Sequence, residues 1–136
     1  LPVEMLRAMP GYDGWLAYPV WTLVRFGRWQ GVLAEPLPLA EFAYATAVSH
    51  VARAIAQARL GNLEEAGRES AEAERNFALL PAESFQGFNP VTALATIARI
   101  SARGSAATEK PSGAKRAAKR ATRRMRTGSS TKAGDT

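Results

Sequence analysis

GRWQGVL (residues 27–33) and GNLEEAG (residues 61–67) each stand between two helical patterns in this chain. Their first glycines, Gly27 and Gly61, lie 34 residues apart. A unit of about 34 residues, built as a helix, a tight glycine-containing turn and a second helix, is typical of α-solenoid repeats. The sequence therefore predicts an all-α fold, an α-solenoid of antiparallel helix hairpins. The alternative is an unrelated helical bundle that also uses glycine at its turns.

The composition is that of one modest domain with a packed core, because 46% of the 136 residues are hydrophobic. The chain has no cysteine, which excludes disulfide bonds, thiolate metal sites and a cysteine nucleophile. No run approaches the roughly 20 apolar residues of a membrane span, so we expect none. Residue 1 is a leucine that continues a helical pattern, so we expect the chain to be the C-terminal part of a longer protein. Compartment and oligomeric state stay open.

Charge divides the chain into two parts. Residues 1–104 carry nine Arg, no Lys and ten acidic residues, which gives a net charge of −1. Residues 105–136 carry nine Lys and Arg against two acidic residues, which gives +7. The overall charge of +6 therefore comes from residues 105–136. It is no evidence that residues 1–104 bind nucleic acid or another polyanion. We divide the chain into a helical repeat domain, 1–104, and a basic tail, 105–136.

Periodicity and turn residues predict helices with no sheet. The expected helical segments are the end of a helix before Pro10, then 13–26, 28–34, 39–60, 63–80 and a last helix from Asn89-Pro90 to Gly104, with a loop over 81–88. Within the first of the longer segments, Pro19 either kinks the helix or occupies its first turn. In the last helix, Leu94, Ile97 and Ile100 are expected to face inward.

The segment 39–60 carries two apolar stripes, which predicts a helix buried on two sides. One stripe is bulky (Tyr44, Val48, Val51, Ile55, Ala58) and the other is small (Ala40, Ala43, Ala47, Ala54). Small side chains allow a neighbouring helix to approach closely, as the middle helix of a stack requires. Asn62 and Glu65 are spaced as a capping box for the helix that follows.

Residues of about 13–80 resemble two tetratricopeptide repeats (TPRs), with the last helix as a cap or half repeat. The second unit carries the better match, in Ala54, Gly61, Asn62, Leu63, Ala66 and Ala73, whereas the first unit keeps only Gly27, Trp29 and Val32. His50, Arg53, Gln57 and Ser70 depart from the large apolar or aromatic residues usual in the family, and Pro81 comes about three residues late. These departures affect how regularly the hairpins would stack into a superhelix, and they leave the prediction of helix hairpins unchanged.

The resemblance implies a non-catalytic scaffold that binds a peptide or partner protein in a concave groove lined by the first helix of each repeat. Counting back along each first helix from Gly27 and from Gly61 gives the positions that correspond in the two units. The positions expected on that surface are Trp21, Arg25, Ile55 and Arg59. Arg25 and Arg59 would form a repeated pair suited to a carboxylate, because each guanidinium offers a planar fork of donors. Both also lie in the last turn of a helix, where a cation is favourable whatever the ligand.

No set of residues makes a catalytic site, and we expect no enzyme activity, no metal and no cofactor. His50 is the only histidine, and no acidic residue of its own helix stands at a neighbouring helical position to orient it. One histidine without cysteine does not suggest a metal site, and no glycine-rich phosphate loop is present. We therefore interpret His50 as a packed structural residue.

The tail supplies the alternative function, a tether to nucleic acid or an anionic surface. Its cations fall on two adjacent rows of a potential helix: Lys115, Lys119 and Arg123 on one and Arg116, Arg120 and Arg124 on the next, with Arg126 beyond. Alone, we expect the tail to be disordered and to fold on an anionic polymer. It resembles the tails of bacterial histone-like proteins in composition only, and no aromatic residue is interleaved for base stacking. A solubilising role is the plain alternative.

Overall fold

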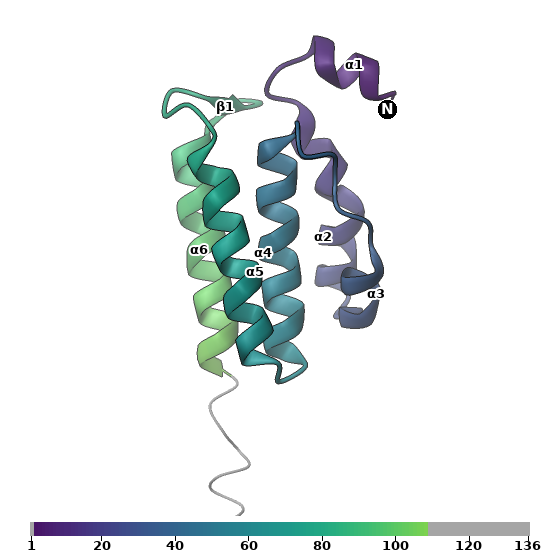
Figure 1. Cartoon of the computed structure of the whole chain (residues 1–136), viewed down its shortest axis with the longest axis vertical. Helices are drawn as coiled ribbons and strands as arrows, with labels where there is room; N and C mark the ends of the chain where they lie inside the picture. Colours follow the sequence, from purple (N-terminus) through teal and green to yellow (C-terminus); the bar gives the residue numbers. More distant parts are fainter. Residues whose placement is uncertain (1, 109–136) are drawn as a thin grey trace, which may run out of the picture.

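The computed structural model describes residues 2–108, and side chains as far as residue 105; the seven basic tail residues, from Lys115 to Arg126, lie outside this range. The described part is mostly helical (Figure 1). Its elements are α1 (Val3–Ala8), the 3-10 helix η1 (Asp13–Ala17), α2 (Tyr18–Arg25), α3 (Trp29–Ala34), α4 (Ala43–Arg59), α5 (Leu63–Ala78), β1 (Phe85–Gln86), β2 (Asn89–Pro90) and α6 (Val91–Thr108).

Gly27 and Gly61 end α2 and α4 with the same hydrogen-bonded turn, as the sequence predicts. Both glycines have left-handed backbone angles, with φ of 65° and 83°. The amide of Arg28 donates to the carbonyl of Leu23, and the amide of Asn62 donates to that of Gln57, each at 2.9 Å. These are the six-to-one bonds of a Schellman motif, which needs glycine because a Cβ is strained at positive φ. The two turns join α2 to α3 and α4 to α5.

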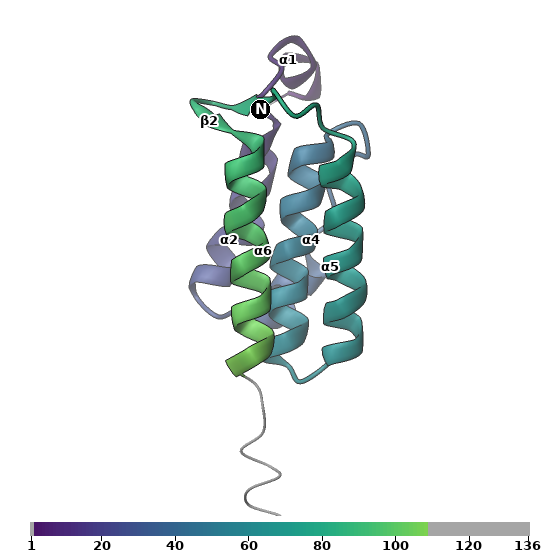
Figure 2. The ribbon, with the colours of Figure 1, turned by 90° about the vertical axis from the view of Figure 1, so that its left-hand side faces the viewer.

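Helix α4 is the centre of the fold and packs against η1, α2, α3, α5 and α6. Figures 1 and 2 show α5 and α6 lying alongside it, with α2 on its far side from α5. Twelve of its 17 residues are buried, including Ala47, Ala54 and the whole run from Ala45 to Ala52. The prediction of a helix buried on two sides is therefore confirmed. Alanine permits this because a small side chain lets neighbours approach from several directions.

The N-terminal end of α4 differs from the prediction, since the helix begins at Ala43 and not near Leu39. Residues 39–42 form a turn in which the amide of Phe42 donates to the carbonyl of Leu39. A carboxylate from another element bonds the first turn: Asp13 Oδ2 accepts from the amide of Ala45 at 3.2 Å. An anion is favourable there because the first amides of a helix have no partner within it.

The expectation of no sheet is wrong, because residues 85–90 form a small antiparallel hairpin in which Phe85 pairs with Pro90 and Gln86 with Asn89. The two-residue connection is Gly87-Phe88, with Gly87 at φ 59°. Glycine at the first central position is the signature of a type II′ hairpin turn. The hairpin rests against the loop before η1, where the amide of Gly87 donates to the carbonyl of Gly11.

Helix α6 departs from the prediction in extent and in orientation. It continues through Gly104 to Thr108, so the boundary proposed between residues 104 and 105 falls within a helix. Ile97 and Ile100 are exposed and not buried. The buried face is made of smaller residues: Val91, Ala95 and Ala98, with Ala102 partly buried beside them.

The predicted capping box at α5 is absent. Asn62 makes no side-chain bond to the helix and instead donates from Nδ2 to Gln57 Oε1 at 2.9 Å. Glu65 pairs with Arg68, which also binds Glu64 as the i, i+4 spacing predicts. Pro19 lies in the first turn of α2, where its missing amide costs no hydrogen bond.

Candidate functional site

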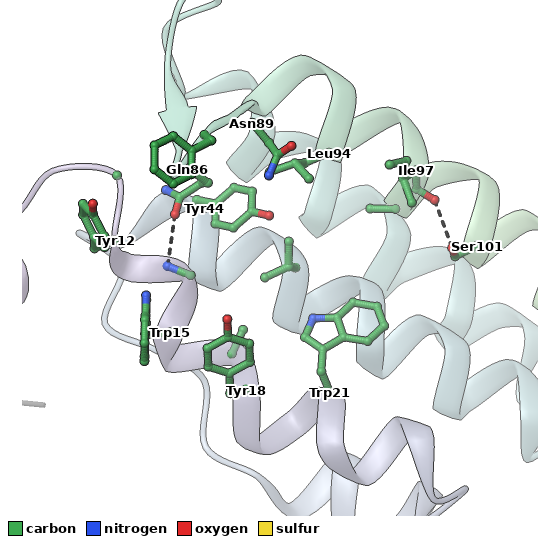
Figure 3. Close-up of a pocket in the computed structure, with 17 residues that line it drawn as sticks. Tyr12, Trp15, Tyr18, Trp21, Tyr44, Gln86, Asn89, Leu94, Ile97 and Ser101 are labelled. Carbon is green, nitrogen blue, oxygen red and sulfur yellow. Dashed lines mark hydrogen bonds between the residues drawn. The ribbon is translucent and has the colours of Figure 1, made fainter.

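An aromatic groove of about 600 Å³ lies along the side of the fold where η1 and α2 face α6. Helix α4 forms its floor and the β1–β2 hairpin closes one end. Figure 3 shows Trp15, Tyr18 and Trp21 on one wall and Leu94, Ile97 and Ser101 on the other. The remaining lining residues are Gly11, Tyr12, Gly14, Ala17, Tyr44, Val48, Gln86, Gly87, Phe88, Asn89 and Ala98. None of the lining residues is acidic, basic or histidine.

Large aromatic side chains are presented to solvent along this groove. Trp15 is 54% exposed and Tyr18 is 60% exposed, and their rings meet edge to face with centroids 5.4 Å apart. Trp21 and Tyr44 are half-buried beside the core. Tyr and Trp offer a large apolar area on a stiff side chain with one polar atom, which is why they dominate binding sites on protein surfaces.

The geometry of the groove depends on a small polar network at its closed end. Asp13 accepts from Gln86 Nε2 and from the amide of Ala45, and Gln86 Oε1 accepts from the amide of Gly14 at 3.3 Å. One carboxylate thus links η1, the start of α4 and the hairpin. Gly14 permits the close contact, because a Cβ there would lie 3.0 Å from the ring of Tyr44 and 3.1 Å from Gln86 Oε1.

The groove is chemically neutral. Burial raises the pKa of the Tyr44 hydroxyl, and the nearby Asp13 carboxylate raises it further, so this hydroxyl stays protonated near neutral pH. The polar side-chain groups that line the groove are hydroxyls, amides and indole N–H groups, among them those of Tyr44, Gln86 and Trp21. Such a surface suits an uncharged ligand with apolar side chains, and it offers no ion pair to a carboxylate or phosphate.

The structure separates the four residues predicted to bind a partner. Trp21 lines the groove. Ile55 is only 6% exposed and belongs to the core, so its predicted place on a binding surface is wrong. Arg25 and Arg59 are exposed at the ends of α2 and α4, and they line neither the aromatic groove nor two further surface cavities of the described part. Helical phase alone identified the face of Trp21 but could not show how deeply Ile55 packs.

Sequence reasoning missed most of the groove. Tyr44 was interpreted as an ordinary position of an apolar stripe, and residues 85–88 were expected to be part of a loop. The one available signal was the pair Gly87-Phe88, a type II′ hairpin connection between two short extended segments. That signal predicts a hairpin but not where it docks.

His50 has an acidic partner, which comes from α5. Its Nδ1 lies 2.6 Å from Glu69 Oε2, and Arg53 Nε donates to Glu69 Oε1 at 2.9 Å. Arg53 also donates to the carbonyl of Leu33, near the end of α3. Burial alone would raise the pKa of the Glu69 carboxyl, but its hydrogen bonds with His50 and Arg53 outweigh this and hold the pKa below its usual range.

The His50–Glu69 pair resembles two members of a hydrolytic triad, but its surroundings are structural. Both side chains are largely buried between α4 and α5, and neither lines any of the three cavities. The second carboxylate oxygen is occupied by Arg53. A general base needs a substrate within hydrogen-bond reach, which this position does not offer. The cluster ties α3, α4 and α5 together.

Among the described residues, no group of His, Asp and Glu is placed to hold a metal ion. No helix in the same part of the chain has both the length and the hydropathy needed to cross a bilayer. No family model matches the chain, and no curated protein or solved structure matches it either.

Proposed function

We propose that this protein is a non-catalytic, TPR-like scaffold that binds an uncharged, apolar peptide segment of a partner protein in the aromatic groove. The observation that carries the proposal is the groove itself: about 600 Å³, walled by exposed Trp15 and Tyr18, without a charged residue. A pocket of this size and polarity is typical of a site that takes apolar side chains.

Two features of the helices support the repeat interpretation. The Schellman turns at Gly27 and Gly61 have matching hydrogen bonds at equivalent positions of two units. Of the α-helices, only α2, α4 and α6 line the groove, and these are the first helices of the two hairpins and of the half repeat; η1, the loop before it and the β1–β2 hairpin supply the other lining residues. In TPR-like scaffolds the first helices form the binding surface, and this supports the groove as the proposed binding site.

The partner's binding segment should be apolar and free of charge at the contact. Desolvating a charged side chain against Trp15, Tyr18 and Ile97 would cost free energy with no opposite charge to offset it. Apolar and proline side chains can pack on exposed tryptophan and tyrosine rings, while Gln86 and Asn89 can bond the backbone of the segment. This expectation replaces the carboxylate clamp that Arg25 and Arg59 suggested.

A library of random peptides displayed on phage tests the proposal. Peptides selected on the wild-type protein are labelled, and their affinities are measured by fluorescence anisotropy. The double variant Trp15→Ala/Tyr18→Ala should bind them at least about tenfold more weakly, because exposed aromatic anchors carry much of such binding energy. Phe26→Ala removes an exposed aromatic residue outside the groove and should leave the affinity unchanged. Failure to select peptides, or undiminished binding by a folded double variant, would refute the groove as the site.

A second candidate function rests on the separation of charge along the chain. The tail holds the net charge of +7 while residues 1–104 hold −1. Under this proposal the tail tethers the scaffold to nucleic acid through phosphate contacts without sequence preference.

Duplex DNA of two unrelated sequences tests the tether with the intact chain. Both should bind equally, with affinity falling steeply as salt rises, because neutralised phosphates release counterions. Binding should be lost when glutamine replaces the seven tail cations Lys115, Arg116, Lys119, Arg120, Arg123, Arg124 and Arg126. The control replaces Arg25 and Arg59 with glutamine and should bind as the wild type does. Absence of binding at low salt would leave the tail without this role.

A further inference from the structure

Every third residue from 12 to 21 is aromatic, and all of these residues line the groove. We call them the aromatic ladder: Tyr12, Trp15, Tyr18 and Trp21. Figure 3 shows them in chain order along one wall. Hydrogen bonds of the 3-10 helix η1 join the first three, since the amide of Trp15 donates to the carbonyl of Tyr12 and the amide of Tyr18 to that of Trp15. Three residues complete one turn of such a helix, so these side chains project in the same direction.

The aromatic ladder presents hydrogen-bond donors as well as rings. An indole N–H can only donate, and a phenol hydroxyl can donate or accept. Within the part of the chain that the structure describes, no side chain of the ladder has a hydrogen-bond partner. Tyr12, Trp15 and Tyr18 are exposed, so water satisfies their polar atoms in the free protein. A ligand that covers these donors must supply acceptors, because a buried donor without a partner costs free energy.

The backbone conformation of the ligand decides whether it can supply those acceptors. In a helical segment the carbonyl groups are already bonded within the helix. An extended segment brings an N–H group from each residue against aromatic rings, which offer no strong acceptor. A polyproline II segment has no internal hydrogen bonds, so its carbonyl groups are free to accept. Each proline in it has no N–H group that could be left without a partner.

We propose that the segment bound in the groove is proline-rich and adopts the polyproline II conformation. Its proline rings pack on the aromatic ladder, and its carbonyl groups accept from the indole and phenol donors. The neutral lining of the groove agrees with this ligand, because proline carries no charge. Such a segment is also preformed, so it loses little conformational entropy in an aromatic-lined groove. This inference rests on the proposed function and names the chemistry of the partner.

The aromatic ladder also sets the length of the bound segment. Six residue steps of about 2.0 Å lead from Tyr12 to Tyr18, and three steps of about 1.5 Å lead on to Trp21, which gives roughly 16 Å. A polyproline II segment rises about 3.1 Å per residue, so about five residues span the ladder. The affinity for proline peptides should therefore rise with length up to about five or six residues and only slowly beyond.

Fluorescence anisotropy with the intact chain tests the chemistry of the ligand. The probes are a labelled proline octamer and an octamer in which alternate prolines are replaced by alanine, which restores N–H groups. The proline octamer should bind at least about tenfold more tightly, because the N–H groups of the second peptide are desolvated without partners. Absence of binding by the proline octamer at millimolar concentration would overturn the inference.

The phage library separates this inference from the proposed function. Peptides selected on the wild-type protein should be enriched in proline. Selected peptides without proline that bind as tightly as the proline octamer, and lose affinity in Trp15→Ala/Tyr18→Ala, would overturn the inference and leave the proposed function standing. Failure to select any peptide would refute both.

A variant that keeps the rings tests the donors. Trp15→Phe/Tyr18→Phe removes one indole N–H and one hydroxyl, and both positions are exposed, so the fold should not change. Its affinity for the proline octamer should fall at least about fivefold, which corresponds to the loss of one ordinary hydrogen bond. Trp29→Phe removes an indole N–H outside the groove and should leave the affinity unchanged. Wild-type affinity in the folded double variant would overturn the proposal that the ladder donors bind the carbonyl groups of the segment.

Discussion

Helices α4 and α6 are similar in length and in alanine content, and they differ in how many neighbours surround them. Helix α4 has 17 residues and α6 has 18. Five elements pack on α4, so 12 of its 17 residues are buried. Helix α6 packs mainly on α4 and α5, and two of its large apolar side chains, Ile97 and Ile100, are exposed to solvent. In both helices small residues therefore face the neighbouring helices. The number of neighbouring elements determines how much of each helix is buried.

The polar links of the two helices to α5 differ in the same way. Helix α4 is joined to α5 by the buried cluster of His50, Arg53 and Glu69. Helix α6 is joined to α5 by Arg99 and Glu74, a paired guanidinium and carboxylate at 2.6 and 2.7 Å that are both about half exposed. We call these the α4–α5 link and the α5–α6 link. An ion pair contributes more where water is excluded, so the first should contribute more to stability.

The largest effect is expected for a leucine inside α4. Ala54 is fully buried, so Ala54→Leu should overfill the contact and lower the free energy of unfolding by about 1–3 kcal/mol. Ala93→Leu, which adds the same atoms to the exposed face of α6, should stay within about 0.5 kcal/mol of the wild type. Urea denaturation of both variants measures the difference. Equal changes in the free energy of unfolding for the two variants would mean that α4 and α6 do not differ in how tightly they are packed at these positions.

The sequence predicted the helices and their turns better than their surroundings. Gly27 and Gly61 were identified because a left-handed turn leaves a local signature, and the Ala-rich segment before Gly61 was long enough to be unambiguous. The inward face of α6 was assigned to Leu94, Ile97 and Ile100 because large apolar residues usually point to the core. For Ile97 and Ile100 this assignment was wrong, because the buried face of α6 is made of smaller residues, Val91, Ala95 and Ala98.

The site was less predictable than the fold for a similar reason. Helical phase alone placed Trp21 on the face of α2 that lines the groove. The partnership of His50 with Glu69 could not be seen, since it joins positions 19 residues apart on two helices. The groove also needs the hairpin to dock on Gly11 and Asp13, more than 70 residues away, and no local pattern encodes that contact.

The α4–α5 link should depend on pH. The pKa of Glu69 is lower in the folded chain than its usual value, so its contribution is complete above the unfolded pKa of about 4.3 and disappears as pH falls through the folded pKa. Glu69→Gln should therefore cost about 1–2 kcal/mol at pH 7 and progressively less in acid. Urea denaturation of both proteins between pH 7 and pH 3 measures this. A cost that does not change over this range would show that the charge of Glu69 is not what stabilises the link.

A smaller effect of opposite sign is expected at Gly104 in α6. A Cβ at this position would meet no atom within 4 Å, and its backbone is helical. Gly104→Ala should therefore raise the free energy of unfolding by about 0.4–1 kcal/mol, because alanine loses less conformational entropy in a helix. Denaturation at low protein concentration keeps the measurement on the single chain. A destabilised variant would mean that the outer side of α6 is covered, contrary to the comparison with α4.

The smallest effect is expected for the α5–α6 link. Glu74→Gln removes the charge but keeps the shape of the side chain, and both partners remain open to water, so the cost should be about 0–0.5 kcal/mol. Arg99 also stacks over the ring of Phe77, 5.9 Å from its centroid, and this contact survives the substitution. The small cost should shrink further at high salt, whereas the cost of Glu69→Gln should persist, because screening acts mainly on exposed charges. A Glu74→Gln cost equal to that of Glu69→Gln, and insensitive to salt, would mean that the two links contribute alike and that burial does not distinguish them.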